Sequence, residues 1–151
     1  MSVTVKDRGW NRIRKEIEAM GRSFVKIGVL SNAGSYPANQ GSMNLAEVAT
    51  AHEFGTGKIP ERPFMRQAFD TGNKKISDFI KNERDKIYQG ASTTDESLHK
   101  LGVLHQGQVQ ETIATGEFAP LAPSTIKRKG SSKPLIDTGR LRQSINFEVS
   151  K

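Results

Sequence analysis

The chain has 151 residues, 34% of them apolar and 26% charged, with a formal charge of +7 and no cysteine. This length fits one domain, spanning 1–151, that buries a core of its own, and the lack of cysteine excludes disulfides and thiolate chemistry and disfavours tetrahedral zinc. No run approaches the roughly 20 apolar residues that cross a bilayer, and Lys6, Asp7 and Arg8 interrupt the N-terminus where a signal peptide has its apolar core, so we expect no membrane segment and synthesis in a cytoplasm.

The first 42 residues predict a helix, a strand and a loop. Apolar residues recur from Trp10 to Met20 at spacings of three and four, which is one face of an amphipathic helix that ends at Gly21. Residues 24–30 are β-rich, with valine and isoleucine on alternate positions, as in a half-buried strand. Residues 31–42 are mostly Asn, Gly, Ser and Pro, which indicates a loop.

Asn44 is expected to cap a short helix that stops at 55–57. Pro60 and Pro63 then predict an extended link, because a residue before proline avoids the α region. Pro63 also suits the first position of a long helix that Gly90 closes. The apolar stripe of that helix is expected to comprise Phe69, Ile76, Phe79, Ile80 and Ile87.

A second long helix is expected to follow at once. Thr93 and Glu96 have the spacing of a capping box, and a weaker apolar face runs from Leu98 to Ile113. Gly102 and Gly107 each disfavour a helix by roughly 1 kcal/mol. They are expected to permit close packing against the preceding helix or to mark a bend.

The C-terminal region predicts an irregular segment and a last strand. Residues 117–136 are rich in Pro and Gly, and residues 145–149 alternate as a strand does. The sum is an α+β fold: a small, mainly antiparallel sheet packed on one face by long helices, with extended loops for subunit contacts. Because long irregular segments in compact domains are usually functional or disordered, we expect the loops 31–42 and 117–134 to dock neighbours.

The positive charge favours polyanionic partners, nucleic acid first. Residues 1–30 carry seven basic and three acidic groups, and residues 117–151 carry seven and three again. A dedicated DNA reader more often concentrates its charge on one helix or face. A solvated basic surface therefore explains the excess equally well.

Residues suited to catalysis or metal binding are few. His52-Glu53 is half of a zincin pattern whose second histidine is missing, and His99 and His105 do not share a helix face well. Each histidine is interpreted as an interfacial or surface residue. No serine lies in G-x-S-x-G or S-x-x-K, and residues 55–58 do not complete a phosphate loop. We therefore expect no enzyme, no cofactor and no metal.

Two segments combine prolines, charges and large apolar residues. The first motif contains EFGT and IPERPFMR within 53–66, and the second reads PLAPSTIKRKGSSKPLIDTGRLRQSI over 120–145. Rigid, pre-extended segments lose less entropy when they dock. The alternative is that Phe54 and Phe64 close the local core. Residues 127–130 could grip a phosphate backbone, form a solvated turn, or contact an acidic neighbour. Subunit or partner contacts are expected from Phe54, Arg62, Phe64, Lys127, Arg128, Lys129 and Arg140.

These motifs, in this order around a long helical pair, resemble the virion-morphogenesis or tail-completion proteins of tailed bacteriophages, also called minor tail or head–tail joining proteins. The resemblance covers most of the chain from about residue 22. It implies a non-catalytic subunit that forms a ring with itself, commonly a homohexamer, in the neck of the virion. Such rings lie between the portal-bound head-connector adaptor and the tail terminator or tail tube, and genomic DNA passes through them.

The resemblance also implies structural roles for individual residues. Phe54, Gly55, Pro63 and Phe64 would shape the turn into the long helix, and Leu135, Asp137, Thr138, Gly139 and Leu141 would anchor the C-terminal region. It assigns no residue to DNA, although scattered Lys and Arg lining a ring would attract phosphates without reading bases. The alternatives are a tail terminator or other minor tail protein and, from a different class, a basic DNA-binding accessory protein.

Overall fold

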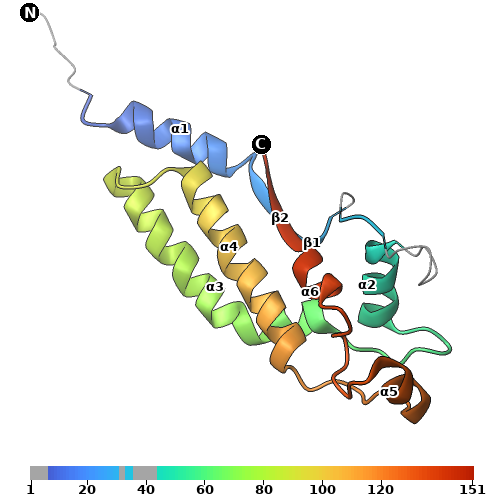
Figure 1. Cartoon of the computed structure of the whole chain (residues 1–151). Coiled ribbons are helices and arrows are strands. Elements are labelled where there is room, and N and C mark those ends of the chain that lie inside the picture. The colour runs from blue at the N-terminus through green and yellow to red at the C-terminus, as the bar shows by residue number, and fades with distance from the viewer. Residues whose placement is uncertain (1–6, 31–32, 36–43) are drawn as a thin grey trace, which may run out of the picture.

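The computed structural model describes residues 7–30, 33–35 and 44–151. The predicted α+β fold is confirmed: helices pack on a two-stranded antiparallel sheet. The molecule is elongated, with α1 and the C-terminus near one end and α2 and α5 near the other (Figure 1). In chain order the elements are α1 (Trp10–Met20), β1 (Phe24–Val29), α2 (Leu45–Phe54), α3 (Phe64–Gln89), α4 (Thr94–Thr115), α5 (Pro123–Lys129), α6 (Arg140–Ser144) and β2 (Ile145–Ser150).

The sheet joins strands from opposite ends of the sequence and packs on α4. β1 and β2 pair so that Ile27 lies opposite Phe147, and α4 contacts both strands. Gly102 makes this packing close, since a Cβ atom there would lie 2.2 Å from the Phe147 ring. The close approach expected at Gly102 is therefore present, but its partner is a strand and not the preceding helix. Gly107 is exposed, with no atom within 4 Å of where its Cβ would be.

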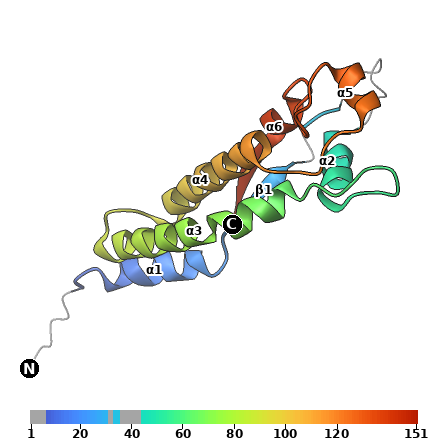
Figure 2. The same cartoon turned by 90° about the horizontal axis from the view of Figure 1, so that it is seen from below.

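The core forms where the α3–α4 hairpin meets α2, α6 and the end of β2; Figure 2 shows α3 and α4 side by side, with α1 along the end of α3. The predicted apolar stripe of α3 is only partly right, because Phe69 and Ile80 are exposed. Between a large apolar residue at each end, the buried row of α3 uses small or polar residues, which let α4 approach. Its members are Phe64, Ala68, Gly72, Glu83 and Ile87.

Helix α1 is held by polar contacts to the tip of this hairpin. The Arg12 guanidinium donates to the carbonyl oxygens of Ile87 at 2.7 Å and Tyr88 at 2.8 Å, at the C-terminus of α3. One turn later, the Glu16 carboxylate accepts the backbone N–H of Thr94 at 2.8 Å, at the N-terminus of α4. Each charge faces the helix end whose dipole has the opposite sign. The hydrogen bond from the Thr94 backbone N–H is the largest cause that lowers the pKa of Glu16 below its usual value.

The apolar face of α1 is the part of the sequence prediction that the packing does not follow. The helix has its expected bounds, but none of its residues is buried. Trp10 is 65% exposed and Ile17 is 46% exposed. The hydrophobic periodicity thus predicted the helix correctly, but it did not predict how much of the helix is buried. The reason is that α1 is attached through the polar contacts of Arg12 and Glu16.

The buried carboxylate of Glu83 holds the C-terminal part of α3 against the N-terminal part of α4. Glu83 accepts hydrogen bonds from Lys86, from Lys100 and Ser97 at 3.1 Å, and from Ser92 at 3.3 Å. The hydrogen bond from Lys86 is the largest cause that lowers the pKa of Glu83, from 4.5 to about 2, and the contacts with Lys100 and Ser97 add to it against the opposing effect of burial.

The Glu83→Gln variant is expected to unfold more easily than the wild type at neutral pH. A lowered folded-state pKa means that the ionised carboxylate stabilises the fold above the unfolded pKa of about 4.5 and loses that effect as the pH falls toward about 2. We expect a loss of about 1–3 kcal/mol at pH 7, shrinking steadily below pH 4.5 in urea titrations. Glu18→Gln, in an exposed pair with Arg14, is the control and should change little. A Glu83→Gln deficit that is constant from pH 7 to pH 3 would contradict this account.

Candidate functional site

The start of α3 is capped by a side chain from another helix. Pro63 occupies its N-cap position and no acidic residue lies in its first turn, so α3 begins at Phe64, one residue later than predicted. The buried carboxylate of Glu53, at the end of α2, accepts the backbone N–H groups of Met65 at 2.9 Å and Arg66 at 3.1 Å. Its negative charge also faces the positive end of the α3 dipole. This contact fixes α2 against α3.

Around this cap the first motif folds onto itself. The Arg66 guanidinium donates to the Glu53 carboxylate at 3.1 Å and to its backbone carbonyl at 2.6 Å, and also pairs with Glu61. The same guanidinium lies 5.3 Å from the centroid of the Phe54 ring, which is a cation–π contact. Phe54 nevertheless remains 67% exposed, so most of its ring faces solvent.

The link between α2 and α3 turns twice. Gly55 has φ 71, and a Cβ atom there would lie 3.0 Å from the backbone nitrogen of Glu61, so only glycine fits. The backbone N–H of Phe64 donates to the Arg62 carbonyl at 2.8 Å, across Pro63 at φ −77 and ψ 67. That is an inverse γ-turn, and it aims the Phe64 side chain into the core, where it is 1% exposed.

Arg62 joins the two motifs. It is 3% exposed, and its guanidinium donates to the carbonyl oxygens of Ala119 at 2.8 Å and Pro120 at 3.0 Å. It also lies 3.5 Å from Nδ1 of His52; because a guanidinium only donates, Nδ1 accepts and the ring proton belongs on Nε2. A residue of the first motif thus holds Pro120, the first residue of the second motif, 58 positions away.

The second motif is more ordered than its composition suggests. Residues 123–129 form α5, with Pro123 in its first turn, so the irregular segment expected over 117–136 contains a short helix. After it, the backbone N–H of Ile136 donates to the Pro134 carbonyl at 2.7 Å, across Leu135 at φ 60. A γ-turn with positive φ is rare and strained. The buried Leu135 side chain belongs to the core cluster together with Leu141, and packing holds the turn in place.

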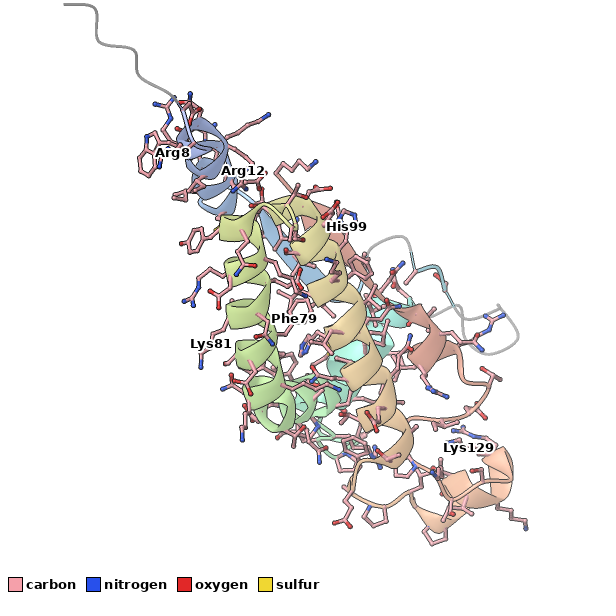
Figure 3. All side chains as sticks on the ribbon, turned by 90° about the vertical axis from the view of Figure 1, so that its left-hand side faces the viewer. Arg8, Arg12, Phe79, Lys81, His99 and Lys129 are labelled. Carbon is pink, nitrogen blue, oxygen red and sulfur yellow. The ribbon has the colours of Figure 1, made fainter. Side chains whose placement is uncertain are left out.

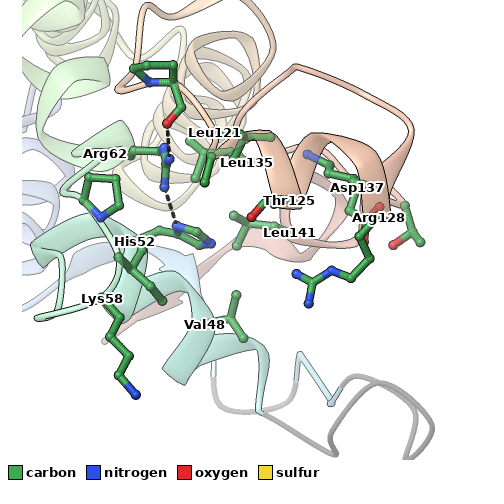
Figure 4. Close-up of a pocket in the computed structure, with 16 residues that line it drawn as sticks. Val48, His52, Lys58, Arg62, Leu121, Thr125, Arg128, Leu135, Asp137 and Leu141 are labelled. Carbon is green, nitrogen blue, oxygen red and sulfur yellow. Dashed lines mark hydrogen bonds between the residues drawn. The ribbon is translucent and has the colours of Figure 1, made fainter.

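Between the two motifs lies an open groove of about 1130 Å³. Figure 4 shows Val48 and His52 of α2 on one side, Thr125 and Arg128 of α5 on the other, and leucine side chains between them. The groove is therefore built by both segments that the sequence singles out. It lies at the end of the molecule away from α1, where Figure 3 labels Lys129.

The groove is positively charged. In the part of the chain that the structure describes, four cationic residues line it, Lys58, Arg62, Arg128 and Lys129, against one carboxylate, Asp137. Burial lowers the pKa of Lys129, whose ammonium donates to the Lys133 carbonyl at 2.5 Å. Burial also lowers the pKa of His52, and the positive charges of Arg62 and Lys129 lower it further. We therefore take the imidazole to be neutral at pH 7.

The structure separates the seven residues expected at partner contacts into three groups. Phe54, Lys127, Arg128 and Arg140 are exposed, and Arg140 also donates to the Ser35 carbonyl at 3.3 Å. Lys129 is half-buried. Arg62 and Phe64 are buried: Arg62 lies in the wall of the groove with its guanidinium bonded within the chain, and Phe64 is part of the core. For Phe64 the alternative holds: its ring closes the local core. The loop 31–42 lies outside the described residues except for 33–35.

The histidines are dispersed. His105 is buried, a correction to its expected surface position: it contacts Gln108 at 2.9 Å and packs edge-on against Phe69. His99 is exposed and packs edge-on against Phe147. Within the described part of the chain, no three His, Asp or Glu side chains are placed to hold a metal ion. None of the helices over the same residues is long and apolar enough to cross a bilayer.

Two features of this site were not predicted from the sequence: the capping of α3 by Glu53 and the positive φ of Leu135. Only the first is indicated by a pattern in the sequence. Helix α3 has no acidic or hydroxyl side chain at its start, so its first N–H groups need an acceptor from elsewhere. Glu53, in an apolar segment just before the link, is a candidate for that acceptor. No comparable signal marks the positive φ of Leu135, because leucine rarely adopts it.

Comparison of the chain with protein-family models, with curated proteins and with solved structures gives no match.

The Arg62→Lys variant should lose stability even though the charge is kept. A lysine ammonium does not reproduce the fork that reaches two adjacent carbonyl groups, so at least one buried carbonyl loses its donor. We expect a loss of about 2–3 kcal/mol in the free energy of unfolding. Arg128→Lys, on the exposed side of the same groove, should stay within about 0.5 kcal/mol of the wild type. Equal stability of the two variants would show that the Arg62 bonds are not formed.

At position 135 glycine should be better tolerated than alanine. Both Leu135→Gly and Leu135→Ala remove the buried side chain, but alanine retains the cost of a positive φ, about 1–2 kcal/mol. Thermal unfolding should therefore rank Leu135→Gly above Leu135→Ala by about 1 kcal/mol. At Leu141, which is buried in α6, the same two substitutions should rank in the opposite order.

Proposed function

We propose that this chain is a structural subunit of a tailed-phage virion, a ring-forming neck protein that completes the tail and joins it to the head connector. The observation that carries the proposal is the meeting of the two motifs on which the resemblance rests. They are more than 50 residues apart, yet the Arg62 guanidinium of the first motif donates to the carbonyl of Pro120, the first residue of the second motif. The chemistry of the resulting groove is that of a docking surface: an apolar floor with cations around it.

The distribution of exposed side chains supports an assembling subunit. Trp10, Phe54 and Val103 are each more than 60% exposed, and they lie on α1, α2 and α4. Interfaces are enriched in aromatic residues, and a subunit placed between different neighbours needs more than one surface. On this proposal the chain, made in the bacterial host cytoplasm, becomes part of the head–tail junction. Its neighbours there are its own copies, the portal-bound adaptor and the tail terminator or tail tube protein.

The arrangement of positive charge fits passage of DNA better than tight binding. Arg8 and Arg12 lie at one end of the molecule and Lys129 at the other (Figure 3). Dispersed cations attract phosphate without specifying sequence. The competing role as a DNA-binding accessory protein predicts that the free chain binds duplex DNA with a steep salt dependence. The third role, a tail terminator or other minor tail protein, predicts defective tails.

Deletion of the gene, followed by electron microscopy of the lysate, tests the proposal. We expect DNA-filled heads beside separate complete tails, and recovery of infectious particles when the wild-type gene is supplied from a plasmid. The destabilised Leu135→Ala variant should rescue less well than Leu135→Gly. Normal virions without the gene would refute the proposal, and tails of irregular length would favour the terminator role instead.

A further inference from the structure

The groove between the two motifs contains cationic side chains that no carboxylate of the described chain neutralises. Within the described residues, the side chains of Lys58 and Arg128 form no ion pair and no hydrogen bond, while other surface cations such as Arg14 and Arg84 are paired with carboxylates. Among the described residues, Asp137 is the only acidic one that lines this groove. The cations on its rim therefore remain available to an external partner.

Arg62 adds a buried charge to the same wall. Its guanidinium is held by two carbonyl oxygens and His52, and no carboxylate pairs with it in the described chain. Carbonyl dipoles satisfy its hydrogen bonds but carry no net charge, so its field extends into the groove. A negative group entering this low-dielectric space would interact with Arg62 more strongly than at an open surface.

The floor of the groove is apolar. Val48, Leu121, Leu135 and Leu141 line it, and Leu135 keeps its place at φ 60. Strained backbone is retained where surrounding packing requires it, and it concentrates at ligand-binding segments. Phosphate groups of a nucleic acid backbone would use the rim cations but have no use for leucine side chains. An apolar side chain flanked by carboxylates uses both.

We propose that this groove binds an acidic segment of another protein, in which one or two large apolar residues are flanked by aspartate or glutamate. The apolar residues pack on Leu121 and Leu135, and the flanking carboxylates lie against Lys58 and Arg128. This inference goes beyond the proposed function, because it names the chemistry of the partner segment and not the assembly to which it belongs.

A displayed library of random twelve-residue peptides, selected on the full-length protein, tests the proposal. Selected peptides should share a Leu, Ile or Phe flanked by acidic residues. One of them, fluorescently labelled, should bind in anisotropy titrations. The double variant Lys58→Glu/Arg128→Glu should weaken binding at least tenfold, because like charges then oppose each other in the groove.

A matched variant separates the groove from the overall charge. Lys75→Glu/Lys81→Glu makes the same change of net charge on the exposed surface of α3 and should bind within twofold of the wild type. Thermal unfolding of all three proteins verifies the fold. Equal weakening by both double variants, a selected consensus without acidic residues, or no selected binder would overturn the proposal. Displacement of the peptide by duplex DNA at equal concentration would assign the groove to nucleic acid instead.

Gene deletion tests the neck role independently, since unjoined particles are expected whether or not this groove binds a peptide.

Discussion

The carboxylate of Glu53 accepts the backbone N–H groups of Met65 and Arg66 in the first turn of α3, and the arrangement of the end of the molecule that holds α2 and α5 depends on that contact. A helix start buried without an acceptor is strongly unfavourable. Because Pro63 supplies no capping side chain, α2 must lie where Glu53 reaches α3. The link from Gly55 to Pro63 is then confined to a short path, and that path leaves Arg62 pointing toward the second motif. One electrostatic requirement thus brings together segments that are far apart in the sequence.

The same principle recurs at the opposite end of the molecule. Arg12 faces the C-terminus of α3 and Glu16 faces the N-terminus of α4. These two charges, one helical turn apart, therefore hold α1 against both sides of the α3–α4 connection. In a chain with only 34% apolar residues, helix ends are a way of fixing elements without a large core. Such contacts are directional, which explains how α1 is placed while its apolar face stays exposed.

Local signals in the sequence predicted the elements well, whereas their burial depended on partners that no local signal names. Asn44 and the Thr93–Glu96 pair cap the helices expected of them, because these two caps are made by residues within four positions of the helix start. Phe69 and Ile80 were expected to be buried but are exposed. The row of α3 that faces α4 contains the small residues Ala68 and Gly72, which let α4 approach. The groove itself was foreseen only as two unusual segments. Their junction through Arg62 requires the tertiary fold.

The two ends of the molecule differ in a way that bears on assembly. At the α1 end, Arg12 and Glu16 form hydrogen bonds within the chain, whereas the side chains of Trp10 and Ile17 are exposed. At the other end, leucine side chains line the groove, while the side chains of Lys58 and Arg128 on its rim form no ion pair with any described residue. A subunit that bound only copies of itself through one two-fold interface would need a single self-complementary patch. Two unlike surfaces at opposite ends suit a subunit that meets different neighbours on its two sides, which is what the proposed position between head connector and tail requires.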